Sequence, residues 1–360
     1  MASTDSNKTY ATLCDEWKDL PLRSDLKFSV YMYIGMYLPA CVMGIAFNIF
    51  NILVLGKLKG AMYFLVKCLA INDLAFSIAA FVIFPLRTIY IFAVLGDILF
   101  RRDDWFFGAW FIYLGTPFFY IFQTTRNWCT TILSFERLIV IMFPMSSRNL
   151  PKKVISTIAM LVVGAFAFAF HFVHFLPYQR MPSIGCPARW PYVTHFSGTY
   201  DLIPPKIYIF WRWHISDEYM FLWFTVTAPL AILVVMNVAL VAAVLFRKFS
   251  RRSELGVKDD SSKNELRVLR MVMSVIGVYI VCEGLGFLDR MNSWNWFKIT
   301  NKKSQMILRK VSLGFSIIDS SVNFGIYCLT NEHFRKQAID MVERLPGCGN
   351  SLSRSATSRR

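Results

Sequence analysis

Four ionisable residues interrupt stretches of the sequence that are otherwise apolar, namely Asp73, Arg126, Glu283 and Asp319. Charged side chains are costly inside a membrane, so they usually face the interior of a helix bundle, where they pair or contact water. At a rise of about 1.5 Å per helical residue, Asp73, Arg126 and Asp319 fall at the same depth, midway through their stretches. We therefore expect these three to form an intramembrane polar cluster, with Glu283 nearer the outer side.

Seven long apolar stretches must position these residues, and each can cross the roughly 30 Å core of a bilayer. They cover residues 29–56, 61–94, 107–141, 153–177, 218–246, 268–288 and 306–330. Because lipid offers no hydrogen-bond partners, the backbone groups of each stretch must pair within it, which favours helices. The sequence therefore predicts an all-α membrane protein, a seven-transmembrane helix bundle with an amphipathic eighth helix.

The composition fits a membrane protein with short tails. Of the 360 residues 55% are hydrophobic and 33 are Phe, which is too apolar for an ordinary soluble domain. We expect an extracellular tail at 1–28, a seven-transmembrane domain at 29–330, and a cytoplasmic amphipathic helix and tail at 331–360. The first tail lacks the apolar core of a cleaved signal, so we expect the first span to serve as the targeting signal.

The basic residues indicate how the bundle is oriented, since cytoplasmic loops are rich in Lys and Arg. With the N-terminus outside, many basic residues next to the ends of the spans fall on the side that we expect to be cytoplasmic. They are Lys57, Lys59, Arg148, Lys152, Lys153, Arg247, Lys248, Arg251, Arg252, Lys258, Lys263, Arg267, Arg335 and Lys336. Several outer cations weaken this rule: Arg101, Arg102, Arg180, Arg189, Lys206, Lys302 and Lys303. The sequon at Asn7 predicts a glycan on the outer tail. The net charge of +16 favours acidic membrane lipid over nucleic acid as a partner.

Two of the eight cysteines should meet an oxidising compartment in this orientation, Cys14 in the outer tail and Cys186 between the fourth and fifth spans. We predict that they form a disulfide that ties the tail to this loop. The alternative is two free thiols, which alkylation and mass spectrometry would detect.

Several short motifs occur in the order found in one large family of membrane proteins. Glu136-Arg137-Leu138, with Pro144 downstream, resembles the Asp/Glu-Arg-Tyr motif of rhodopsin-like G-protein-coupled receptors. Residues 319–327 resemble their Asn-Pro-x-x-Tyr region, with Phe in place of Pro. Further positions match in order: Asn48, Leu69, Ala70, Asp73, Leu74, Trp105, Phe107, Gly108, Pro229, Phe334 and Arg335. The resemblance covers residues 30 to 340 and implies a receptor in the plasma membrane.

Within this family, the Asn-Phe-x-Ile-Tyr-Cys string at 323–328 and Pro229 followed by Asn237 are most similar to invertebrate FMRFamide-type neuropeptide receptors. The chain also departs from the family. Ile112 stands where a cysteine usually pairs with the second extracellular loop, and Cys-Glu-Gly-Leu at 282–285 replaces Cys-Trp-x-Pro.

The resemblance implies an activation switch made of Glu136, Arg137, Glu265, Asn323 and Tyr327. A contact between Arg137 and Glu265 would lock spans three and six together, and its opening would expose a cleft for a heterotrimeric G protein. Arg137 has Glu136 as a second candidate partner. It could also be solvated or held by lipid phosphate.

The polar cluster gains a second interpretation from the resemblance. In relatives, the aspartate equivalent to Asp73 helps to hold a sodium ion, usually with a small hydroxyl residue where this chain has Arg126. We infer that the Arg126 guanidinium replaces the ion and bridges Asp73 and Asp319. The alternative is a structural ion pair without a switching role. We expect no bound metal and no cofactor.

Acidic and aromatic residues near the outer side indicate the chemistry of the ligand. The expected ligand-binding residues are Phe119, Gln123, Glu283, Asp289, Asp217 and Glu218. Acids beside aromatic rings suit a guanidinium next to a phenyl group, as in an amidated peptide that ends in Arg-Phe. Phe119 replaces the aspartate of amine receptors, and Ile317 replaces the retinal-binding lysine of opsins. Alternatively, the outer aromatic residues merely form interface belts.

The segment after Thr330 predicts an amphipathic helix at the membrane surface, because apolar residues recur at helical spacing. Cys348 beyond it is a candidate for palmitoylation, and the serines that follow are candidates for phosphorylation and arrestin binding.

Three other functions compete with that of a peptide receptor. An enzyme is disfavoured because the sequence shows no metal-ligand motif, phosphate loop or nucleophile elbow. A small-molecule or chemosensory receptor remains open. A transporter or channel could use the intramembrane charges as a path, but no repeated half with broken helices is evident.

Overall fold

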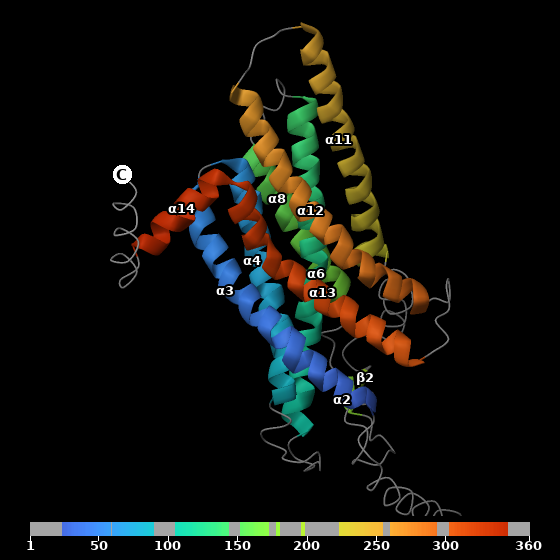
Figure 1. The fold of residues 1–360 in the computed structure, drawn as a ribbon. Helices are drawn as coiled ribbons and strands as arrows, with labels where there is room; N and C mark the ends of the chain where they lie inside the picture. Colours follow the sequence, from blue (N-terminus) through green and yellow to red (C-terminus); the bar gives the residue numbers. More distant parts are fainter. Residues whose placement is uncertain are drawn as a thin grey trace, which may run out of the picture.

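The computed structural model describes residues 24–58, 60–89, 105–143, 152–172, 178–180, 196–198, 223–254, 260–293 and 302–344. Within these ranges seven membrane-length helical segments form one bundle (Figure 1). The segments are α2 (Ser24–Tyr31) with η1 (Met32–Tyr37) and α3 (Leu38–Lys57), α4 (Ala61–Phe81) with η2 (Val82–Leu86), α6 (Trp105–Met142), α8 (Lys152–His171), η5 (Trp223–Thr227) with α11 (Ala228–Glu254), α12 (Asp260–Ser293) and α13 (Lys302–Thr330).

An eighth helix, α14 (Glu332–Glu343), follows α13 after one residue and turns away from it (Figure 1). Asn331 ends α13 in an extended conformation, and its side-chain oxygen accepts a hydrogen bond from the Phe334 amide at 3.1 Å. This is an N-cap, which satisfies one of the unpaired amides at the start of a helix. Following the predicted orientation, we call the end of the bundle that carries α14 the inner end, and the opposite end the outer end.

The prediction of an all-α seven-helix bundle is confirmed, with some differences in the bounds. By length and apolarity alone, four helical segments among the described residues qualify as membrane spans: Phe28–Lys57, Tyr63–Ile89, Lys153–His171 and Trp223–Ala243. The helices α6, α12 and α13, with 38, 34 and 29 residues, are also long enough to cross a membrane and contain Arg126, Glu283 and Asp319. In addition, two short strands, β1 (Tyr178–Arg180) and β2 (Phe196–Gly198), pair antiparallel in the stretch between the fourth and fifth helices.

Each of the π-helical turns η1, η2 and η5 lies at a proline. Pro85 is inside η2, whereas Pro39 and Pro229 stand two residues after the ends of η1 and η5. Proline has no amide hydrogen, so a helix that contains it cannot complete the bond to the carbonyl four residues earlier. At Pro229 that carbonyl belongs to Thr225, and it accepts a hydrogen bond from Asn127 of α6 at 2.6 Å instead. The local widening of the helix thus ties the fifth segment to the third.

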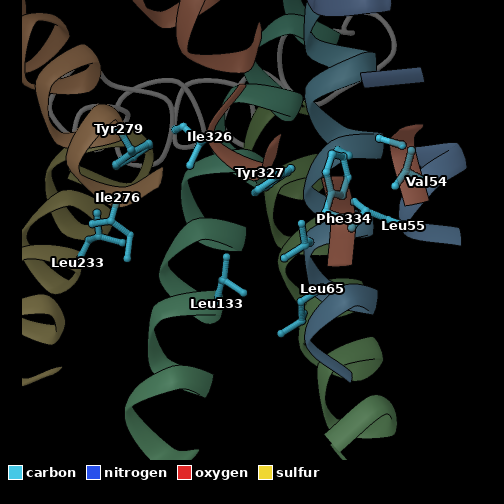
Figure 2. Close-up of a cluster of buried hydrophobic side chains, with 13 residues drawn as sticks. Val54, Leu55, Leu65, Leu133, Leu233, Ile276, Tyr279, Ile326, Tyr327 and Phe334 are labelled. Carbon is cyan, nitrogen blue, oxygen red and sulfur yellow. The ribbon is translucent and has the colours of Figure 1, made fainter. Parts of the chain in front are cut away.

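A cluster of apolar side chains holds the inner half of the bundle together (Figure 2). Leu133 of α6 lies near its centre, and Tyr327 of α13 lies between it and Phe334 of α14. Phe334 is fully buried, and its ring is 5.6 Å from that of Tyr327. The apolar face of α14 therefore packs against the bundle, while Lys336 on its other face is exposed.

A second apolar cluster, rich in aromatic rings, fills the outer half between the first, second, third and seventh segments. Phe119 of α6 is central to it, with its ring 4.8 Å from Phe76 and 5.7 Å from Phe84. The polar residues described next lie between these two clusters, where there is little water to compete for their hydrogen bonds.

Candidate functional site

Arg126 of α6 stands at the centre of an ion cluster that we define as Asp73, Arg126, Glu283 and Asp319. Its Nε is 3.2 Å from Oδ1 of Asp73 in α4, its Nη2 contacts Oδ2 of Asp319 in α13, and its Nη1 is 3.7 Å from Oε1 of Glu283 in α12. All four side chains are buried, with residue exposures of 0 to 3%. One guanidinium thus joins four helices.

Neutral groups complete the coordination of these charges. Ser316 of α13 accepts from Arg126 Nη1 through its backbone carbonyl at 3.0 Å, and its hydroxyl donates to Glu283 Oε1 at 2.6 Å. Asn323 Nδ2 donates to Asp73 Oδ2 at 2.8 Å. The guanidinium carbon lies 5.4 Å from the centre of the Phe76 ring, a favourable cation–π distance.

The charges in this cluster do not balance. Three carboxylates share one guanidinium, and a buried charge without a partner is very costly. Since planar Arg has five donors in a fixed fork, it can satisfy several carboxylate oxygens together. Any event that gives one carboxylate another cation would let Arg126 shift toward the remaining two, and would thereby change how the four helices are held.

The predicted cluster of Asp73, Arg126 and Asp319 is brought together in the structure, and Glu283 lies with it. The sequence had indicated a position for Glu283 nearer the outer side, among the ligand-binding residues. Ser316, which links Glu283 to α13, was not predicted. The only signal in the sequence was position, because Ser316 precedes Asp319 by three residues and hence lies on the same face of the helix.

The other described residues that were expected to bind ligand lie in different surroundings. Phe119 packs in the outer apolar cluster, and Gln123 is buried one turn outward from Asn127. Among the described residues no group donates a hydrogen bond to Gln123 Oε1. Asp289 lies farther along α12 and is half-buried. Their role in binding stays a prediction.

The residues of the expected activation switch lie along the inner half of the bundle. Arg137 is 9% exposed, and its Nη2 is 3.5 Å from Oε2 of its neighbour Glu136. Glu265 belongs to α12, but its side chain lies outside what the structure describes. Asn323 is bonded to Asp73, and Tyr327 is buried in the inner apolar cluster.

Several predicted sites lie outside the described residues altogether: Asn7, Cys14, Cys186, Asp217, Glu218 and Cys348. Five cysteines within the described ranges, Cys41, Cys68, Cys129, Cys282 and Cys328, are free thiols. Within the same ranges no group of three or more His, Cys, Asp or Glu side chains is arranged to hold a metal ion.

A second buried polar group, not predicted from the sequence, links the third, fourth and fifth segments. Thr124 Oγ1 is 2.8 Å from His171 Nε2 and 3.2 Å from Thr225 Oγ1. All three side chains are fully buried. The loosened turn at Pro229 brings Thr225 into this group, so Pro229 was the available signal in the sequence.

The family model described as 7 transmembrane receptor (rhodopsin family) matches residues 46–327, which is more than half of the chain. No curated protein matches the sequence. The family match agrees with the bundle of described helices and with a multi-pass membrane protein that has an extracellular ligand and a G-protein partner. The chain belongs to the rhodopsin family of seven-transmembrane receptors.

Proposed function

We propose that this receptor lies in the plasma membrane with its N-terminus outside, and binds an amidated neuropeptide of the Arg-Phe-amide type. The observation that carries the proposal is the contact between Glu283 and Arg126, in which a buried acid already holds a guanidinium. A ligand arginine offers the same group to the same carboxylate. The aromatic cluster around Phe119 would accept the adjacent phenyl ring by burial and stacking.

In this proposal Arg126 acts as an internal stand-in for the arginine of the ligand. Its contact with Glu283, at 3.7 Å, is longer than its contact with Asp73, at 3.2 Å, so Glu283 is the partner most easily exchanged. Once the ligand pairs with Glu283, Arg126 still has two carboxylates. The exchange therefore leaves neither guanidinium without an acid.

The exchange would also loosen the sixth segment. Glu283 is tied to α13 through the Ser316 hydroxyl, and α12 and α13 pack along each other. A change in that bond frees α12 to move relative to α13. Toward the inner end, Asp73 accepts a hydrogen bond from Asn323, and one turn farther Tyr327 packs against Phe334 in the inner apolar cluster. This path gives the ligand a physical route to the G-protein side.

At the inner end, we propose that Arg137 exchanges Glu136 for Glu265 in the inactive receptor, and that activation breaks this lock. The pairing with Glu265 rests on the family resemblance and on the position of Glu265 in α12. Replacement Glu265→Ala should then raise basal G-protein signalling, and Arg137→Ala should abolish agonist-driven signalling. Unchanged basal signalling in Glu265→Ala would remove the lock from the mechanism.

The residues outside the described ranges have proposed roles of their own. We place a glycan on Asn7, a disulfide between Cys14 and Cys186, and a palmitoyl chain on Cys348. Asp217, Glu218 and Asp289 are proposed as further acids for the ligand. Arrestin is the proposed partner of the phosphorylated tail.

The proposed function is tested by screening C-terminally amidated peptides, including an Arg-Phe-amide series, on cells that express the receptor with a promiscuous G-protein reporter. Each active peptide is compared with an analogue in which citrulline replaces arginine, since citrulline keeps the shape and removes the charge. We expect the analogue to lose at least about tenfold in potency, because a charge-assisted hydrogen bond is lost.

The receptor variant Glu283→Gln should lower the potency of the arginine peptide and reduce its advantage over the citrulline analogue. Glu343→Gln is the matched control, since Glu343 is an exposed acid on α14 at the inner end. Equal potency of the two peptides on the unmodified receptor would contradict a guanidinium-recognising site. Silence toward the whole series, with the receptor present at the cell surface, would indicate another ligand class.

A further inference from the structure

A group of cations and phenols occupies the outer end of the bundle, outward of the ion cluster. We define this outer basic group as Tyr33 and Tyr37 of η1, Arg87 just after η2, and Arg309 and Lys310 of α13. These residues come from the first, second and seventh segments, which are adjacent at this end. The function proposed above uses none of them.

Lys310 is the centre of the outer basic group. Its ammonium contacts the Tyr33 hydroxyl and lies 4.4 Å from the centre of the Tyr33 ring. Its backbone carbonyl accepts a hydrogen bond from the Tyr37 hydroxyl at 2.6 Å. The Tyr33 ring in turn packs 5.3 Å from that of Tyr37. Lys310 is thus half-buried in an aromatic setting and held in place by neutral groups.

The positive charges in this group act on one another. Arg87 and Arg309 both interact electrostatically with Lys310 and with Tyr33. Like charges repel, and partial burial leaves less water to screen them. Among the ion pairs formed between described residues, none includes Lys310 or Arg309.

We propose that the outer basic group is a subsite for a carboxylate of the extracellular ligand, with Lys310 as its central donor. Arg309, which is exposed, supplies a second positive charge. Tyr33 and Tyr37 hold Lys310 in position. As a ligand subsite it rests on the proposed function and adds an acidic residue to the peptide.

The geometry also sets the spacing of that acidic residue. Ser316, which binds Glu283, lies six residues after Lys310 in α13, or about 9 Å along the helix. An extended peptide advances about 3.3 Å per residue. A carboxylate that reaches Lys310 while the ligand arginine reaches Glu283 should therefore stand about three residues before the arginine.

The first test uses the full receptor in nanodiscs of phosphatidylcholine alone, with Arg-Phe-amide peptides that carry Glu or Gln two, three or four residues before the arginine. The unmodified receptor should bind the Glu peptide at least about tenfold more tightly than its Gln partner at the best spacing. Lys310→Gln should bring this ratio close to one, whereas Lys310→Arg should retain it. Lys336→Gln, a change in an exposed lysine at the inner end, should leave it unchanged.

The second test asks whether lipid supplies the anion. The thermal unfolding midpoint is compared in nanodiscs with and without phosphatidylglycerol. If lipid occupies the subsite, phosphatidylglycerol should raise the midpoint less in Lys310→Gln than in the unmodified receptor and in Lys310→Arg. Lipid contacts at the inner end are common to all three proteins, so the difference isolates the outer end.

The two tests decide the proposal together. A Glu preference that depends on the charge of residue 310 supports the subsite. Peptide binding without such a preference, or a dependence on residue 310 in the lipid test alone, overturns it and leaves the proposed function standing. If no Arg-Phe-amide peptide binds the unmodified receptor, the proposed function fails, and the ligand subsite fails with it. If Lys310→Gln does not fold, Arg309→Gln replaces it and should show the same change, smaller in size.

Discussion

At the scale of single residues, Arg126 has the largest predicted effect, because it is the common partner of three buried carboxylates. Replacement Arg126→Gln keeps much of the side-chain volume and removes the charge. Loss of one member of a buried ion pair typically costs about 3–5 kcal/mol. We expect a large fall in the thermal unfolding midpoint of the purified receptor and little protein at the cell surface.

Two other variants serve as comparisons for Arg126→Gln. Glu283→Gln should be milder than Arg126→Gln, since it removes the most distant of the three carboxylates and the amide can still bond to Ser316. Lys336→Gln removes an exposed lysine that is 3.1 Å from Glu332, and such pairs contribute at most about 1 kcal/mol. Equal midpoints for Arg126→Gln and Lys336→Gln would show that the ion cluster does not stabilise the fold.

The sequence could predict the depth of the charged residues but not all their contacts. The rise per residue placed Asp73, Arg126 and Asp319 at one level, and they are in contact in the structure. Glu283 was expected farther out. Rise gives distance along a helix, while contact also depends on tilt and on the reach of a long side chain, and both α12 and α13 run obliquely through the bundle (Figure 1).

At the scale of the helices, the crossing of α3 with α4 and α13 is set by Gly44. A Cβ atom at this position would lie 2.7 Å from Ser77 Oγ and 2.9 Å from Ser321 Oγ. Both hydroxyls are already engaged, Ser77 with the Asp73 carbonyl and Ser321 with the Ala40 carbonyl. We expect Gly44→Ala to cost about 1–3 kcal/mol through overpacking, measured as a lower thermal unfolding midpoint.

Gly164 of α8 provides the control for this prediction. No atom lies within 4 Å of a Cβ placed there, so Gly164→Ala meets no obstacle and gains helix propensity, worth up to about 1 kcal/mol. The two variants should therefore shift the midpoint in opposite directions. A similar fall in both would indicate that glycine is needed for its backbone freedom rather than for close packing.

The attachment of α14 depends on the Asn331 cap. Asn331→Ala removes the acceptor for the Phe334 amide, a change that typically costs about 1 kcal/mol, whereas Asn331→Asp keeps it. We expect faster amide hydrogen exchange along α14 in the first variant and unchanged exchange in the second. Faster exchange in both variants would show that the side-chain oxygen is not what stabilises the start of the helix.

Apolar runs and motifs were enough to predict the number and order of the helices, because lipid forces long apolar segments to be helical. They could not predict where the backbone departs from the α-helix. The turns η1, η2 and η5 each lie at a proline, but Pro117 of α6 has no such turn beside it. Proline removes a hydrogen bond, and neighbouring helices decide how the backbone responds. The short β1–β2 pair was also missed, since three-residue strands leave no pattern in hydropathy.

At the scale of the whole receptor, the ion cluster predicts that stability does not depend on sodium. The unfolding midpoint should be equal in NaCl and KCl at the same ionic strength, because Arg126 fills the space between Asp73 and Asp319. In the Arg126→Ser variant, the unfolding midpoint should be higher in NaCl than in KCl. The serine hydroxyl and both carboxylates then offer oxygen ligands to a sodium ion, and an ion that binds the folded state stabilises it. Lys336→Gln serves as the control, and its unfolding midpoint should be equal in the two salts. A sodium-specific rise in the unmodified receptor would mean that the guanidinium and the ion coexist, and Arg126 could then not be the permanent substitute for the ion.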